Sequence, residues 1–323
     1  MAEIGPLDDG SERRTLGGRG PAVTALGLGC APIGNLFAGV TDDDARATVD
    51  AAWDAGVRYF DTAPLYGHGT SERRLGRALR DRPRNEYVLS TKVGRVLVPA
   101  GAERPASVFA DLGELEPEFD FSHDGILRSL DESLARLDTD RIDVALVHDP
   151  DDHESEAFEH AFPTLVRLRD EGVVAAIGCG MNQTAMLERF VARVDLDCVL
   201  LAGRFSLLDR SGTELLEQCA ARDVGVILGG VFNTGVLIDP DAHPTYDYAA
   251  APETVVERAR RFQAVCRERG IALGAAALQF GMRHPAVTTV LVGARSPAEV
   301  ALDVSYAVSP IAADVFAAID RVQ

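Results

Sequence analysis

The sequence predicts a parallel (β/α)8 barrel, and three observations point to this fold class. Eight short apolar runs, mostly rich in β-branched residues, recur along the 323 residues, and eight strands are what a closed parallel barrel requires. Several runs are apolar at every position, as expected for strands that are buried on both faces. Helical patterns lie between the runs, and this alternation is typical of βα units in a parallel sheet.

The elements follow one another in a regular order. The predicted strands cover residues 26–29, 57–60, 87–91, 142–147, 173–177, 198–201, 224–228 and 288–292. The predicted helices cover residues 41–55, 71–80, 124–136, 156–170, 182–191 and 211–222. Thr41 and Ser71 are followed by acidic residues, which is typical of helix starts because side-chain oxygens accept from free backbone N–H groups. Gly56, Gly172 and Gly270 each follow a helical pattern, where a residue with positive φ commonly ends the helix.

Two long segments, residues 94–122 and 232–251, interrupt the repeat. Both follow predicted strands, and in a barrel the loops after strands form the catalytic face. Long loops in compact domains are usually functional, so we expect both to cover the substrate; the alternative is a simple surface insertion. We expect one domain over residues 1–323, with residues 1–13 frayed, because the sequence contains no linker or low-complexity tract.

Composition excludes several classes of function. The net charge of −18 argues against nucleic acid or an anionic membrane as a partner, since both attract clustered Lys and Arg. The five cysteines are an odd number without a C-x-x-C pair, so neither a disulfide framework nor a zinc site is expected, and we predict no metal. The sequence has no signal peptide, and no apolar run approaches the roughly 18 residues of a membrane span, so a cytoplasmic protein is expected. The oligomeric state stays open.

Polar residues follow several predicted strands, and in a parallel barrel all strand ends meet at one rim. They are Asp61 and Tyr66 after the second strand, Lys92 after the third, His148 after the fourth and Asn182 after the fifth. Titratable side chains that converge in this way predict an acid–base site. Each residue alone also has a structural explanation: a turn or helix cap, a rim aromatic, a surface lysine or a loop histidine.

Three motifs contain Asp61, Tyr66, Lys92 and His148, namely Phe60-Asp-Thr-Ala-Pro-Leu-Tyr-Gly67, Ser90-Thr-Lys-Val93 and Leu146-Val-His-Asp-Pro150, and a fourth motif, Ser71-Glu-Arg-Arg-Leu-Gly76, follows the first. In this order, each at or close after the end of a predicted strand, they resemble the aldo-keto reductase superfamily, a family of TIM barrels, from about residue 14 to the end. Residues 128–137, 202–209, 229–235 and 246–252 further resemble the branch that contains L-fucose dehydrogenase (D-threo-aldose 1-dehydrogenase) and pyridoxal 4-dehydrogenase.

The resemblance implies an NAD(P)-dependent oxidoreductase that oxidises a cyclic hemiacetal, such as the aldose L-fucose or pyridoxal, to a lactone. Tyr66 is expected to act as the acid/base. Lys92, held by Asp61, is expected to lower the pKa of Tyr66, and His148 to donate to the substrate oxygen. The alternative on the same scaffold is an NADPH-dependent reductase of aldehydes or ketones. A cofactor-sensing binding protein and a metal-dependent hydrolase are further, weaker alternatives.

The resemblance also implies cofactor contacts. Asn182 corresponds to a residue that binds the nicotinamide carboxamide. Phe205 corresponds to an aromatic ring that stacks on nicotinamide, the alternative being core packing. The pyrophosphate loop corresponds to Phe232, Asn233, Thr234, Gly235 and Leu237.

Residues after the eighth strand are expected to decide between NAD and NADP. Gly293, Ala294 and Glu299 stand where NADP-specific members place Lys, Ser and Arg. A carboxylate repels a 2′-phosphate and accepts from a ribose hydroxyl, so Glu299 predicts NAD. Arg295 opposes this interpretation, because it could bind the phosphate, and NADP stays an alternative.

The substrate is expected to be a small sugar or aldehyde. Side chains near the two long segments are the predicted partners of its hydroxyls, namely Asp120, His123, Arg204, Tyr246 and Asp247, with the apolar Phe109 and Phe121 beside them.

Overall fold

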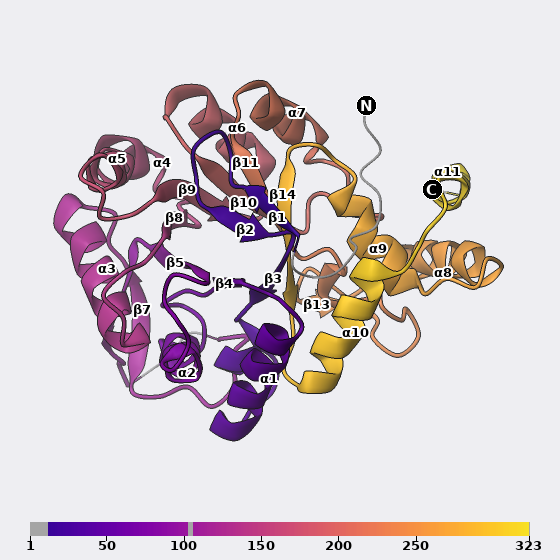
Figure 1. Ribbon diagram of the computed structural model, residues 1–323, viewed down its shortest axis with the longest axis horizontal. Coiled ribbons are helices and arrows are strands. Elements are labelled where there is room, and N and C mark those ends of the chain that lie inside the picture. Colours follow the sequence, from indigo (N-terminus) through magenta and orange to yellow (C-terminus); the bar gives the residue numbers. More distant parts are fainter. Residues whose placement is uncertain (1–11, 103–105, 323) are drawn as a thin grey trace.

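The computed structural model, which describes residues 12–102 and 106–322, contains a closed barrel of eight parallel strands surrounded by helices (Figure 1). The strands are paired in the order β10-β11-β14-β3-β4-β5-β8-β9. Their bounds are β3 (Leu26–Gly29), β4 (Tyr59–Asp61), β5 (Val88–Val93), β8 (Val144–His148), β9 (Ala176–Met181), β10 (Cys198–Ala202), β11 (Gly225–Gly229) and β14 (Val287–Gly293). The predicted fold class is confirmed.

The fifth barrel strand lies further along the chain than the sequence indicates. The apolar run at residues 173–177 predicts its start at Val173, but Val173 is 46% exposed and β9 begins at Ala176. Strand β9 contains Gly178, where an added Cβ would lie 2.2 Å from the carbonyl oxygen of Cys198. Close packing against β10 therefore requires a glycine, and a glycine weakens the strand pattern in the sequence.

Helices cover the outer face of the barrel. They are α1 (Asp42–Asp54), α2 (Thr70–Leu79), α3 (His123–Leu137), α4 (Glu154–Glu156), α5 (Phe162–Asp170), α6 (Thr184–Arg193), α7 (Thr213–Ala221), α8 (Glu253–Arg267), α9 (Leu273–Met282), α10 (Pro297–Val308) and α11 (Ala313–Arg321), with shorter helical turns η1 (Pro32–Gly34), η2 (Ala157–Ala161) and η3 (Asn233–Gly235). Thr41 caps α1 as predicted, since its hydroxyl accepts from the Asp44 N–H at 3.1 Å. Gly56, Gly172 and Gly270 all have positive φ, which confirms the predicted helix ends.

A hairpin of β1 (Arg13–Thr15) and β2 (Ala22–Thr24) lies across the end of the barrel where the strands begin (Figure 1). Leu16 and Val23 from this hairpin are fully buried and join the apolar cluster that contains Tyr59, Val88 and Val144 from the barrel strands. Of the residues expected to be frayed, 1–11 lie outside the described residues, whereas Arg13 begins β1.

The two long segments are not structureless. The first contains an antiparallel hairpin of β6 (Arg95–Pro99) and β7 (Leu115–Phe119), and the second contains η3 and a small hairpin of β12 (Thr245–Tyr246) and β13 (Ala249–Ala250). Residues 103–105 of the first segment lie outside the described part. Among the described residues, no single helix is long and apolar enough to cross a membrane; α10 and α11 reach that length and composition only as a pair bent by 99°.

Candidate active site

Three neighbouring strands bring the predicted tetrad to one rim. Asp61 ends β4, Lys92 lies near the end of β5, and His148 ends β8. Because β4, β5 and β8 are paired in parallel, with Asp61 opposite Ser90 and Lys92 opposite Leu146, these residues lie at the same end of the barrel. Tyr66 follows β4 on the loop to α2.

The loop that carries Tyr66 is fixed by close backbone contacts. Gly67 has φ +59°, and an added Cβ there would lie 2.2 Å from the Gly34 carbonyl oxygen. A Cβ on Gly34 would in turn lie 2.9 Å from the backbone of Tyr66. The two glycines therefore let the β4–α2 loop and the turn η1 meet, which places Tyr66 beside the strand ends.

A buried ion pair forms the base of the site. Nζ of Lys92 lies 2.7 Å from Oδ2 of Asp61 and donates to the Thr62 carbonyl at 2.9 Å. Burial alone would lower the pKa of Lys92, but the neighbouring Asp61 and Tyr66 outweigh it and the pKa is raised. Lys92 is therefore a fixed positive charge at neutral pH.

The other oxygen of Asp61 is also occupied, because Ser90 donates to Oδ1 of Asp61 at 2.7 Å. A buried carboxylate with both oxygens bound is held in one orientation, and it holds the ammonium of Lys92 in turn.

Tyr66 contacts both partners predicted from the sequence. Its ring centroid lies 4.5 Å from Nζ of Lys92 and 6.0 Å from the His148 ring, which stands at 87° to it. Lys92 lowers the pKa of Tyr66 as expected, but burial raises it by more, so the pKa lies above the ordinary phenol value. Desolvation of the phenolate is the larger effect. The hydroxyl is therefore protonated at neutral pH in the absence of ligands.

His148 is neutral. Burial first, and then the positive charges of Lys92 and Arg95, hold its pKa well below the ordinary value. Its Nδ1 is buried without a hydrogen-bond partner among the described residues. Its Nε2 side faces Asp149.

Two charged residues beside His148 were not predicted. Oδ2 of Asp149 lies 3.5 Å from Nε2 of His148 and 3.1 Å from Nη2 of Arg95. Asp149 lies in the His148 motif, and Arg95 lies three residues after Lys92. Their closeness in the sequence to tetrad residues could therefore have indicated that they belong to the site. Only the chain reversal after β5 reveals that Arg95 turns back toward the rim.

The residues predicted to contact the cofactor differ in how exposed they are. Asn182 is exposed just after β9, and its carbonyl accepts from Nε of Arg204 at 2.9 Å. Phe205 is 7% exposed and stacks on Phe280 with centroids 5.1 Å apart. Phe205 therefore packs against Phe280 at the edge of the core, and its stacking on nicotinamide stays a prediction.

The segment predicted to bind pyrophosphate is divided in the same way. Asn233 is buried and accepts from Ser206 Oγ at 2.5 Å, and Leu237 is fully buried in a cluster with α8 and α9. Both side chains are therefore structural, and a contact of their backbone with pyrophosphate stays a prediction. Phe232, Thr234 and Gly235 are partly exposed, and φ of Thr234 is +66°. These three stay candidates for a contact with the cofactor.

Glu299 and Arg295 lie together at the start of α10. Glu299 accepts from the Arg295 backbone N–H at 2.9 Å, and its carboxylate lies 3.7 Å from Nε of Arg295. Ser296 caps the same helix by accepting from the Glu299 N–H. Gly293 is exposed directly before this turn. One turn along α10, Asp303 is 4% exposed, and burial followed by the nearby Glu299 raises its pKa to about 8.

These residues fit a nicotinamide dinucleotide. Arg295 has a buried Nε without a hydrogen-bond partner in the described chain, and the start of α10 offers a partial positive charge to an anion. Gly203 and Gly229, at the ends of β10 and β11, are buried, yet added Cβ atoms would meet nothing closer than 3.7 Å. At these two glycines an added Cβ would therefore make only ordinary van der Waals contacts, and the cation Arg295 follows β14.

Most of the predicted substrate partners contact side chains other than those of the tetrad. Arg204 and Asp247 are paired with each other at 2.9 Å, Tyr246 donates to Asp209 and Asp120 accepts from Ser122. His123 contacts Thr164 and Arg167, on α5, and Phe121 is core. Only Phe109 contacts the tetrad, with its ring 6.0 Å from that of Tyr66.

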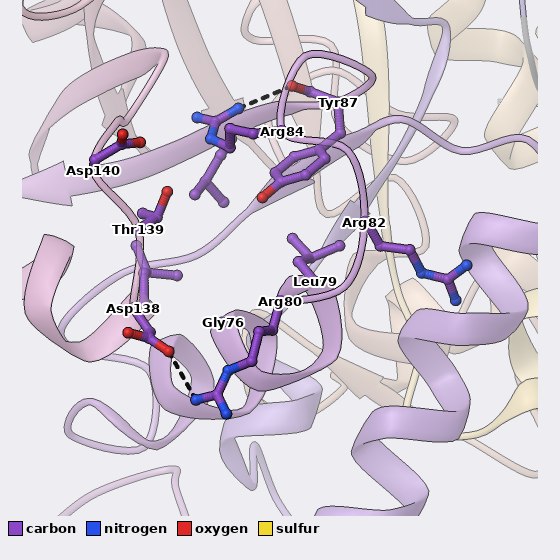
Figure 2. A pocket seen from close by; sticks show the side chains of 11 residues that line it. Gly76, Leu79, Arg80, Arg82, Arg84, Tyr87, Asp138, Thr139 and Asp140 are labelled. Carbon is purple, nitrogen blue, oxygen red and sulfur yellow. Dashed lines mark hydrogen bonds and ion pairs between the residues drawn. The ribbon is translucent and has the colours of Figure 1, made fainter.

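A hollow of about 240 Å³ lies away from the rim, between α2 and α3 (Figure 2). Its arginines already have partners: Arg80 pairs with Asp138 at 2.7 Å, and Arg84 donates to the Tyr87 carbonyl. Nowhere in residues 12–102 and 106–322 do three His, Cys, Asp or Glu side chains gather as a metal site.

Known proteins resemble this chain over nearly its full length. It is 43% identical over 307 residues to D-threo-aldose 1-dehydrogenase of a Pseudomonas species, covering 92% of this chain and 93% of that protein. It is 41% identical to pyridoxal 4-dehydrogenase of Microbacterium luteolum, covering 90% and 91%. The predicted similarity to this branch is confirmed.

Comparison of structures gives the same result. An aldo-keto reductase from Bacillus halodurans, in its holo form, superposes with a TM-score of 0.77 at 25% identity, covering 97% of this chain and 96% of that one. The sequence pattern of the Aldo/keto reductase family matches residues 25–323. This chain therefore belongs to the aldo/keto reductase family and is an NAD(P)-dependent oxidoreductase.

Proposed function

We propose that this enzyme oxidises a cyclic hemiacetal, an aldose such as L-fucose or pyridoxal, to a lactone, with Tyr66 as the acid/base. The observation that carries the proposal is the buried Lys92–Asp61 pair at 2.7 Å, whose positive end lies 4.5 Å from the Tyr66 ring. A fixed ammonium beside a phenol stabilises the phenolate, which is the form needed to accept a proton.

The four side chains divide the work on one oxygen. A bound nicotinamide cofactor supplies the hydride chemistry. Tyr66, as the phenolate left after its own hydroxyl proton has been released, takes the proton of the anomeric hydroxyl as the C–H bond breaks and the C=O bond forms. Lys92 stabilises the charge on the phenolate, and Asp61 orients Lys92. Neutral His148 hydrogen-bonds the same substrate oxygen and holds it toward Tyr66.

For the cofactor, we propose NAD. Glu299 lies 3.7 Å from Arg295 and partly neutralises its positive charge, which disfavours a 2′-phosphate. The residues proposed to hold the cofactor are Asn182, Phe205, Phe232, Asn233, Thr234, Gly235, Leu237, Gly293 and the Arg295–Glu299 pair. An NADPH-dependent reductase of aldehydes or ketones is the second candidate, and the buried Nε of Arg295, which has no hydrogen-bond partner among the described residues, supports it.

We propose one domain that works in the cytoplasm on a small-molecule substrate, without nucleic acid or membrane partners. The five buried, free cysteines and the net charge of −18 support this setting.

The test is a screen of the purified protein with NAD and with NADP against L-fucose, other aldoses and pyridoxal, following the absorbance of reduced nicotinamide. The expected result is NAD-linked oxidation, with the lactone trapped as a hydroxamate. Reduction of simple aldehydes by NADPH, without oxidation of any aldose or of pyridoxal, would instead support the second candidate.

A further inference from the structure

Arg95 and Asp149 are a second charged pair in the site, and the mechanism above does not use them. Each directly extends a strand that carries a tetrad residue: Asp149 follows His148 at the end of β8, and Arg95 follows Lys92 at the start of β6. They lie 3.1 Å apart, and the Asp149 carboxylate also reaches to 3.5 Å from Nε2 of His148. The pair therefore lies next to the atom that would hold the reacting substrate oxygen.

The backbone on both sides is shaped to place this pair. Asp149 has φ +41°, in the left-handed region. Gly94 has φ +92°, and a Cβ there would lie 2.2 Å from the Phe121 ring, so only glycine lets β6 turn back over the rim. Two unusual backbone conformations thus bring opposite charges together beside His148.

The side chain of Arg95 is also held from behind. Its guanidinium carbon lies 4.3 Å from the centroid of Phe119, which stacks on Phe121 at 5.7 Å. The side chain is only 15% exposed, and its Nε is buried with no hydrogen-bond partner in the described part of the chain. This packing restrains the guanidinium, whose fixed array of N–H donors suits it to bind a ligand oxygen.

The spacing matches two neighbouring hydroxyls of a sugar ring. The 3.5 Å between His148 Nε2 and Asp149 Oδ2 is too long for a good direct hydrogen bond. Neighbouring ring oxygens are themselves about a hydrogen-bond length apart, so one can bind His148 while the next binds the pair. A hydroxyl both donates and accepts, and the pair offers a carboxylate acceptor and a guanidinium donor at one point.

We propose that Arg95 and Asp149 bind the hydroxyl on the carbon next to the reacting carbon, and so select aldoses that carry a 2-hydroxyl. This inference rests on the proposed oxidation of a closed-ring hemiacetal. Asp149 accepts from the 2-hydroxyl, Arg95 donates to it, and both determine specificity without taking part in the proton transfer.

The experiment compares D-arabinose with its 2-deoxy analogue, 2-deoxy-D-ribose, using the wild type and Asp149→Asn. The wild type is expected to prefer D-arabinose in kcat/KM by about tenfold to hundredfold, the usual effect of a lost hydrogen bond to a charged group. Asp149→Asn should reduce this preference to within about threefold, mainly through KM for D-arabinose. Arg95→Met, which keeps an apolar stem on Phe119, should reduce it in the same way.

A matched control is available at Asp138. It also has a left-handed backbone, with φ +52°, and pairs with an arginine, Arg80, at 2.7 Å, but in the distant hollow of Figure 2. Asp138→Asn should leave the preference unchanged. Equal losses on both sugars in Asp149→Asn would overturn the inference, because the residue would then only position His148, and so would an unchanged preference.

A different result would reject the proposed function while still deciding this inference. If the wild type oxidises neither aldoses nor pyridoxal, the proposed function is wrong. Calorimetric titration of the two sugars in the presence of NADH then replaces the kinetic comparison. Tighter binding of D-arabinose by the wild type, but not by Asp149→Asn, supports the pair as a hydroxyl site. Equal affinities, or no binding of either sugar, reject it.

Discussion

Tyr66 is subject to two opposing effects on its pKa. Burial makes the phenolate costly, and the ammonium of Lys92 makes it less so. A phenol in this position transfers a proton only with help from its neighbours, which explains why Lys92 is itself held by Asp61.

Tyr66→Phe should reduce turnover by several orders of magnitude, because it removes only the hydroxyl that exchanges the proton. NADH binding, followed by fluorescence, should stay within about threefold of the wild type, since the ring still fills the space between Lys92 and Phe109. Near-normal turnover would contradict the proposed role of Tyr66.

Glu299 has two roles that substitutions can separate. Glu299→Gln keeps the hydrogen bond with the Arg295 N–H but removes the charge beside Arg295. We expect the ratio of kcat/KM for NADP to that for NAD to rise in Glu299→Gln and to rise further, by about tenfold or more in total, in Glu299→Arg. A wild type that already prefers NADP strongly would identify Arg295 as the determinant instead.

At the scale of the element, α10 carries a buried carboxylate. The pKa of Asp303 is raised to about 8. Between about pH 4, where an unfolded aspartate loses its proton, and pH 8, only the folded protein keeps this proton. Stability from this group is therefore complete below about pH 4 and is lost as the pH rises toward 8.

Asp303→Asn keeps a neutral side chain at every pH and should stabilise the protein more at pH 8 than at pH 5. The difference should be on the order of 1–4 kcal/mol in the free energy of unfolding, measured in denaturant. Asp131→Asn, on the exposed face of α3, is the control and should show no such trend. An equal effect of Asp303→Asn at both pH values would show that Asp303 is ionised in the folded protein.

The barrel strands and the helices up to α7 were accessible from the sequence because each is specified locally, by apolar runs, caps and glycines. The helices after residue 222 were not among the predicted ranges. The hairpins β6–β7 and β12–β13 were not, because their pairing joins polar, Pro- and Gly-rich stretches without an alternating pattern. The tetrad was accessible because parallel strands end on one rim. The role of Phe205 is not specified by the sequence alone, since an aromatic residue near a rim can pack inward, as Phe205 does against Phe280, as well as face a cofactor. Arg95 and Asp149 depend on backbone turns that only the folded chain shows.

At the scale of the molecule, the two ends of the barrel have different tasks. The β1–β2 hairpin closes the end where the strands begin, and the tetrad occupies the opposite rim. Arg19 on the hairpin also pairs with Asp197 at 2.5 Å, beside the start of β10. Changes at the hairpin should therefore affect stability without affecting the chemistry.

Leu16→Ala removes a fully buried side chain from the barrel interior and should cost about 2–5 kcal/mol in the free energy of unfolding. The kcat of the folded variant should match the wild type. Val173→Ala, at a residue that is 46% exposed, is the control and should change stability by less than about 0.5 kcal/mol. A fall in kcat for Leu16→Ala would show that the two ends of the barrel are coupled.

The β6–β7 hairpin carries Arg95 and Phe119 but pairs only with itself, outside the ladder of eight strands. We therefore expect the hairpin to tolerate replacement. Its sequence can diverge, or be replaced by a hairpin from a relative, while the barrel keeps its closure and Lys92 keeps its place. Under the proposed oxidation of aldoses, we expect hairpins grafted at this position to change substrate selectivity while the eight-stranded ladder stays intact.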